Sequence, residues 1–160
     1  MSAPRPTNPP TKPSKKPSKK SDRFRSRDWP IEQLPGLSDI DSQKLISCEI
    51  LTTHQLLQRA SHPSKQQALA IRLQLRVQKI QKWVAMADLA RVPNVGIEYC
   101  GLLLHCGVAT VAQLAQLSVH RLHPHIRRFQ VATLQRQDLC PGPEEVTLWI
   151  QQARQLSGMR

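Results

Sequence analysis

The amino-acid sequence predicts an all-α fold, and three observations lead to this prediction. Aromatic residues make up 4% of the 160 residues and there are only six glycines, so neither a β-sandwich nor a glycine-rich nucleotide-binding sheet has suitable material. From Leu73 to Ala87 apolar residues recur at alternating spacings of four and three, as on one face of a helix. Threonine and proline stand where several helices are expected to begin.

The first 27 residues differ in composition from the rest of the chain. Up to Asp28 there are nine basic and two acidic residues, so this stretch carries +7 of the net charge of +12. It also holds six of the thirteen prolines, and apart from Met1 its only large apolar side chain is Phe24. Burial cannot offset the entropy lost on ordering such a segment. We therefore expect a disordered Pro/Ser/Lys-rich basic tail over 1–27 and a folded domain over 28–160.

The folded domain is expected to begin with two short elements and a turn. We predict a short helix over 29–34, a hairpin-like turn over 35–38 and a helix over 39–48. The apolar residues available for burial on this last helix are Ile40, Leu45 and Ile46.

Two further helices complete the first part of the domain. Thr52 supplies the N-cap oxygen for a helix from Thr53 to about Arg59. Ser64 followed by Gln67 is a capping-box pattern, which predicts the start of one long helix. The apolar stripe of that helix consists of Leu73, Val77, Ile80, Val84 and Ala87, and we expect it to face a partner helix.

The second part of the domain carries similar signals. Residues 93–96 predict a turn, Gly107 a helix C-terminus and Thr110 an N-cap. Pro143 suits a first helical position and is followed by two glutamates, which favour the positive end of a helix dipole. One apolar face of this last helix consists of Val146, Trp149, Ile150, Ala153 and Leu156.

These similarities reflect an internal repeat. Residues 34–56 align with residues 92–114 at a constant offset of 58, which matches Cys48 with Cys106. Further on the offset is 66 and matches Trp83 with Trp149, so the second copy gains about eight residues between 122 and 143. We predict two pseudo-repeated units, about 29–90 and 91–157. Each is too small to bury a good core alone, so they should pack as one compact domain.

The two predicted turns resemble a known motif. Leu34-Pro35-Gly36-Leu37 and Val92-Pro93-Asn94-Val95-Gly96 are similar to the hydrophobic-Pro-Gly-hydrophobic-Gly turn of helix-hairpin-helix modules. Two such motifs in tandem, each followed by a Trp-bearing helix, resemble the bacterial domain-of-unknown-function family 4332, which includes cyanobacterial proteins, over residues 29–156. The resemblance implies two units in which backbone N–H groups of the turns approach a DNA phosphate.

The resemblance assigns the candidate phosphate clamps to the turn residues Pro35, Gly36, Leu37, Ser38, Pro93, Asn94, Val95 and Gly96. Ser38 replaces the second glycine of the first turn and Asn94 the first glycine of the second turn, where asparagine tolerates the left-handed conformation. The acidic neighbours Asp39, Asp41 and Glu98 would repel phosphate. The alternative interpretation is therefore that the turns only pack helices together.

Basic side chains elsewhere are the other candidate contacts. The tail offers Lys12, Lys15, Lys16, Lys19, Lys20, Arg23, Arg25 and Arg27, with a solvated, solubilising extension as the alternative. Residues 120–128 hold three histidines together with Arg121, Arg127 and Arg128. This segment is interpreted as a second polyanion-binding patch, as an ordinary solvated loop, or as a metal site completed by Cys106 or Cys140.

The remaining candidate residues have structural interpretations. Trp29, Trp83 and Trp149 are expected to be core anchors, with stacking platforms for single-stranded bases as the alternative. The four cysteines form no CxxC pair, and we expect free, mostly buried thiols, Cys48 and Cys106 among them. A redox pair of Cys100 with Cys106 is the less favoured interpretation. We expect a cytoplasmic protein, with nucleoid association as the alternative placement, because no export or membrane signal is present in a basic chain.

The leading hypothesis is a non-catalytic protein that binds nucleic acid, DNA rather than RNA, without sequence preference. It requires no cofactor and no metal, and no catalytic constellation is recognisable. The alternative is a protein–protein adaptor whose helical body docks on a partner complex while the tail engages an acidic protein or RNA. An enzyme that acts on nucleic acid is a third hypothesis.

Overall fold

The structure is a computed structural model that describes residues 3–4, 26–134 and 140–158. The predicted disordered tail lies outside the described residues except for its positions 3, 4, 26 and 27. In the described part of the chain there are eight α-helices, one short 3-10 helix and no strand. The all-α prediction is therefore confirmed.

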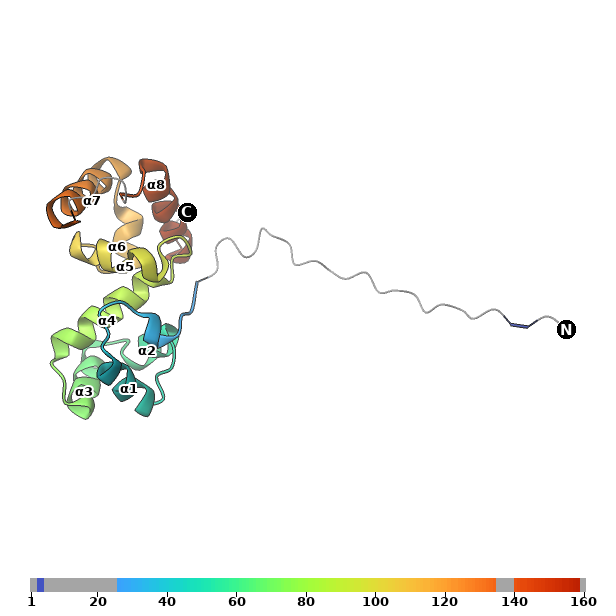
Figure 1. Cartoon of the computed structure of the whole chain (residues 1–160), viewed down its shortest axis with the longest axis vertical. Helices are drawn as coiled ribbons and strands as arrows, with labels where there is room; N and C mark the ends of the chain where they lie inside the picture. Colours follow the sequence, from blue (N-terminus) through green and yellow to red (C-terminus); the bar gives the residue numbers. More distant parts are fainter. Residues whose placement is uncertain (1–2, 5–25, 135–139, 159–160) are drawn as a thin grey trace.

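The helices divide by position into two halves (Figure 1). The N-terminal half contains η2 (Ile31–Gln33), α1 (Asp39–Ser47), α2 (Thr53–Arg59), α3 (Pro63–Leu73) and α4 (Val77–Ala90), and the C-terminal half contains α5 (Gly96–His105), α6 (Val111–Gln116), α7 (Val119–Leu134) and α8 (Pro143–Leu156). In Figure 1, α1 and α3 lie at one end and α7 and α8 at the other. Helices α4 and α5 pack against each other and join the halves.

Several predicted helix ends are confirmed. The Thr52 hydroxyl accepts a hydrogen bond from the Gln55 N–H at 3.2 Å, and the Thr110 hydroxyl accepts one from the Gln113 N–H at 3.0 Å. Gly107 follows the last turn of α5 with a φ of +87°, as a C′ glycine does. Pro143 opens α8. Side-chain capping and backbone restriction thus fix these boundaries as expected.

The predicted long helix is wrong, because the chain breaks it into α3 and α4. Gln74 adopts a left-handed conformation with a φ of +56°, and the Leu75 N–H donates to the Ala70 carbonyl to close α3. The predicted Ser64–Gln67 capping box is also wrong, because His62 is the N-cap residue of α3 and makes no side-chain cap. Pro63 opens this helix instead.

The core runs through both halves and includes two of the three tryptophans. Trp83 is 2% exposed and Trp149 is fully buried. Trp29 is only partly buried and donates from its indole N–H to the Ala90 carbonyl at 2.9 Å. Ile40 contradicts its predicted burial, because it is 70% exposed. No helix in the described part of the chain is long and apolar enough to span a membrane.

All four cysteines are free, as predicted, but they are buried to different degrees. Cys48 and Cys100 are buried, whereas Cys106 and Cys140 are only partly buried. The prediction of a buried thiol is therefore wrong for Cys106, because this residue ends α5 at the edge of the core.

Candidate nucleic-acid interface

Helix α7 displays the basic residues that the sequence singled out. Leu122, Ile126 and Gln130 recur every fourth residue and are buried against the body. The other faces carry three exposed arginines, Arg121, Arg127 and Arg128, while the helix contains no aspartate or glutamate. The interpretation of this segment as a solvated loop is wrong, because the segment is helical and Pro124 lies inside the helix.

The histidines of α7 do not form a metal cluster. His120 and His125 are exposed and His123 is partly buried. In the described ranges no three His, Cys, Asp or Glu side chains are grouped so that they could hold a metal ion. Helix α7 contacts α5 through two stacked rings, those of Phe129 on α7 and His105 on α5, whose centroids lie 5.3 Å apart.

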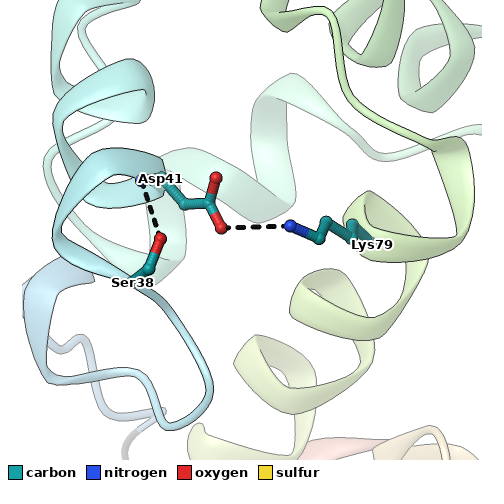
Figure 2. Close-up of polar contacts among 3 residues, drawn as sticks. All are labelled: Ser38, Asp41 and Lys79. Atoms are coloured by element: carbon teal, nitrogen blue, oxygen red, sulfur yellow. Dashed lines mark hydrogen bonds and ion pairs between the residues drawn. The ribbon is translucent and has the colours of Figure 1, made fainter.

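The first predicted turn is closed by a capping serine and a compensated aspartate. Gly36 has a φ of +78°, and the Ser38 hydroxyl accepts a hydrogen bond from the Asp41 N–H at 3.1 Å. The Asp41 side chain, from a residue only 7% exposed, lies 3.4 Å from the Lys79 ammonium of α4 (Figure 2). Lys79 therefore offsets one of the negative charges that were expected to repel phosphate.

The second predicted turn is closed by a side-chain pair. The Asn94 N–H donates to the Gln152 amide oxygen at 3.0 Å, and the Gln152 amide nitrogen donates to the Asn94 side-chain oxygen at 2.8 Å. The N–H groups of Val95 and Gly96 donate to the Val92 carbonyl at 3.1 and 3.0 Å. These three turn N–H groups are thus engaged inside the protein rather than free for a phosphate.

The two turns also differ in backbone conformation. The left-handed residue of the first turn is Gly36, whereas that of the second is Gly96, which aligns with Ser38. Asn94 does not have a positive φ, so this turn does not use the left-handed conformation that asparagine tolerates. A Cβ on Gly96 would lie 3.2 Å from the Trp29 ring, so this turn is also packed against an aromatic side chain.

The tail residues lie mostly outside the described part of the chain. This holds for Lys12, Lys15, Lys16, Lys19, Lys20, Arg23 and Arg25. Arg27 is described and exposed; its N–H donates to the Arg91 carbonyl at 2.9 Å, and its guanidinium carbon lies 6.0 Å from the Trp29 ring centroid. The described chain therefore enters the body between the halves, away from α7 (Figure 1).

Two glutamates of the described C-terminal half lie near a tyrosine. Burial raises the pKa of Tyr99, and the nearby carboxylates of Glu145 and Glu98 raise the pKa further. The Tyr99 ring packs on Trp149 with centroids 4.8 Å apart. Burial also raises the pKa of Cys106 to about 11, so that this thiol near α7 is neutral at pH 7.

Sequence reasoning missed the polar contacts that fix the turns. Gln152 is 2% exposed and lies beside Trp149 and Ala153 on the buried face of α8. A polar residue within an apolar stripe is the signal that could have pointed to a buried hydrogen-bonded partner. Asp88 was missed too: it accepts a hydrogen bond from the Val111 N–H at 2.8 Å and pairs with Arg91 at 2.9 Å.

Comparison with known proteins gives one match. The family model of a domain of unknown function, DUF4332, matches residues 35–156, from the first turn to the last residue of α8. No curated protein and no solved structure matches the chain.

Proposed function

The chain belongs to the DUF4332 family, and we propose that it is a non-catalytic protein that binds nucleic acid without reading its sequence. The family model covers both turns and all eight α-helices of the described chain. DNA is the expected ligand, RNA the less favoured one. The basic tail supplies most of the affinity, and α7 extends the contact onto the folded body.

The observation that carries the proposal is the charge of α7. Its three arginines are exposed, and no acidic residue within the helix competes for them. Guanidinium groups donate to phosphate oxygens, and such contacts position a protein on the backbone without reading bases. A helix with this composition supports polyanion binding that follows salt rather than sequence.

The turns have a structural role in this proposal. The N–H groups of the second turn bond within the protein, and the first turn is flanked by Asp39, which is exposed. Neither arrangement favours a phosphate. The tail and α7 therefore carry the contact, and the turns hold the helices in place.

The test is a fluorescence-anisotropy titration of the full chain with duplex DNA, single-stranded RNA and polyglutamate at two salt concentrations. Replacing Lys15, Lys16, Lys19 and Lys20 by Gln should lower the slope of log affinity against log salt by about 0.9 per phosphate contact on duplex DNA. An unchanged slope would remove the tail from the interface. Equal affinity for DNA and polyglutamate would contradict nucleic-acid binding itself.

A second candidate function is that of a protein–protein adaptor, and an exposed isoleucine favours it. Ile40 is 70% exposed in a shallow hollow of about 560 Å³ on α1, beside Asp39 and Lys44. An exposed apolar side chain gains free energy when a partner protein removes it from water, so Ile40 can contribute to docking. Replacing Arg121, Arg127 and Arg128 by Gln separates the candidates: duplex binding should weaken if α7 faces DNA and stay unchanged if the body docks on a protein instead.

A further inference from the structure

A small hollow lies where α7 crosses the loop between α5 and α6. Its volume is about 200 Å³, which leaves room for several water molecules. Apolar side chains line part of it: Val108, Leu117 and Leu122. The polar side chains that line it are Gln113, Arg121 and His125.

The charge of this hollow comes from α7. Arg121 and His125 are four residues apart, so they lie on the same side of the helix one turn from each other. Both are exposed, and in the described part of the chain neither side chain has a hydrogen-bond or ion-pair partner. Among the residues that the structure describes, none that lines the hollow is an aspartate or glutamate. Two donors thus face one hollow without an internal acceptor.

The wall opposite α7 is fixed by hydrogen bonds. The Gln113 amide donates to the Gly107 carbonyl at 3.0 Å and accepts from the Ala109 N–H at 3.0 Å. The Gly107 and Val108 N–H groups donate to carbonyls of α5. Because the hydrogen-bonding groups of this wall already have partners, they do not compete with a ligand for the Arg121 and His125 side chains. The partly buried Cys106 beside them is a neutral thiol, so it adds no negative charge.

We infer that this hollow is a phosphate-binding subsite, in which the Arg121 guanidinium and the His125 imidazole donate to one phosphate group. The inference rests on the proposed function, because it identifies the part of the body that holds a nucleic-acid phosphate most specifically. Arginine suits this role through its fork of N–H donors. The phosphate comes either from a 5′ end or from an internal phosphodiester.

The test titrates the full chain with inorganic phosphate and monitors the arginine Nε–H and histidine imidazole signals by NMR. Phosphate should shift the signals of Arg121 and His125 in a saturable way, while equal chloride should not. Arg121→Gln and His125→Gln should each weaken phosphate binding about tenfold, the effect expected when a charge-assisted hydrogen bond is lost. Circular dichroism checks that both variants are folded, which their exposed positions favour.

Arg72→Gln is the control variant. Arg72 is an exposed arginine on α3 that does not line the hollow and is not part of the proposed interface, so phosphate affinity should be unchanged in this variant. The inference is overturned if phosphate shifts the signals of neither Arg121 nor His125, or if Arg72→Gln weakens phosphate binding as much as Arg121→Gln. If duplex DNA still binds in that case, the proposed function stands and only the subsite is rejected.

Duplexes with and without a 5′ phosphate distinguish the two sources of the ligand. A preference for the phosphorylated duplex that disappears in Arg121→Gln supports a chain end as the ligand. Equal binding of the two duplexes, weakened alike in Arg121→Gln, supports an internal phosphodiester. If phosphate saturates the hollow but no duplex binds, the subsite stands and the proposed nucleic-acid function falls.

Discussion

The two halves of the body have the same order of helices but differ in the third helix of each. Helices α4 and α8 each span 14 residues, and threonine caps both α2 and α6. By contrast, α3 spans 11 residues and α7 spans 16. The basic residues of α3 are Lys65 and Arg72, whereas α7 carries three arginines and three histidines. Helix α7 is thus five residues longer than α3 and carries more basic residues.

The turns of the halves differ in a related way. In the first half Gly36 lies over Met86 of α4, since a Cβ on Gly36 would be 4.0 Å from the Met86 Cε. In the second half the aligned residues are Asn94 and Gln152, which share two hydrogen bonds. One turn thus packs on an apolar side chain and the other on a buried amide. Similar sequences close similar corners with different chemistry.

The largest expected effect should be equal in the two halves. Trp83→Ala and Trp149→Ala each remove a large buried side chain, so each should lower the free energy of unfolding by about 3–5 kcal/mol. Urea unfolding, monitored by circular dichroism, measures the free energy of unfolding of both variants. A cost for one variant more than twice that for the other would mean that the halves do not share their packing.

A smaller effect should separate the two turn glycines. Alanine at a positive φ costs about 1–2 kcal/mol, and this cost applies to both Gly36→Ala and Gly96→Ala. Gly96→Ala adds a close contact with the Trp29 ring at 3.2 Å, for a total of about 3 kcal/mol. The same unfolding measurement should rank Gly96→Ala as the more damaging change. The opposite order would contradict the packing of Trp29 on this turn.

The Asn94–Gln152 pair can be replaced by the residues at the aligned positions of the first half, Gly36 and Met86. Gln152→Met leaves the Asn94 N–H and side-chain oxygen without their partner, which should cost about 1–3 kcal/mol. Adding Asn94→Gly copies the Gly36 and Met86 arrangement, so the double variant should cost less than the sum of the single variants. A double-mutant cycle measures the difference. Additive costs would show that the two amides do not stabilise each other.

The smallest expected effect on stability concerns one buried thiol of the second half, that of Cys100. Burial raises the pKa of Cys100 from 9.0 to about 11. As pH rises above 9 the unfolded chain releases this proton first, so stability is full below pH 9 and is lost as pH rises through about 11. Melting temperatures between pH 8 and 10.5 should therefore fall less steeply in Cys100→Ser, which introduces the residue found at the aligned position 42. Equal pH slopes would contradict this assignment.

Local signals predicted much of the fold. Thr52, Thr110, Gly107 and Pro143 act within one helical turn of their position, so the sequence alone reveals them. The break at Gln74 was not predictable in the same way, because glutamine is a good helix former and adopts the left-handed conformation only where the body requires it. The apolar stripe continues across the break and hides it.

The candidate site was predictable in composition but not in geometry. The arginines of α7 were found as a basic segment, while the helix that carries them was not expected, because Pro124 disfavours helix interiors. The pairing of Asp41 with Lys79 joins residues 38 positions apart, and that of Asn94 with Gln152 joins residues 58 apart. Such contacts depend on how helices pack, which no local pattern in the sequence records.

The most direct test of the proposed role of α7 compares matched charge changes in the two halves of the full chain. One variant replaces Arg121, Arg127 and Arg128 by Gln, and the other replaces the exposed Lys65, Arg72 and Arg76 by Gln. The salt dependence of duplex DNA binding is then measured for both. The α7 variant should lose up to about 2.7 from the slope, at about 0.9 for each arginine that contacts a phosphate, while the other variant keeps the slope of the unchanged chain. An unchanged slope in the α7 variant, or an equal loss in both, would contradict a nucleic-acid interface on α7.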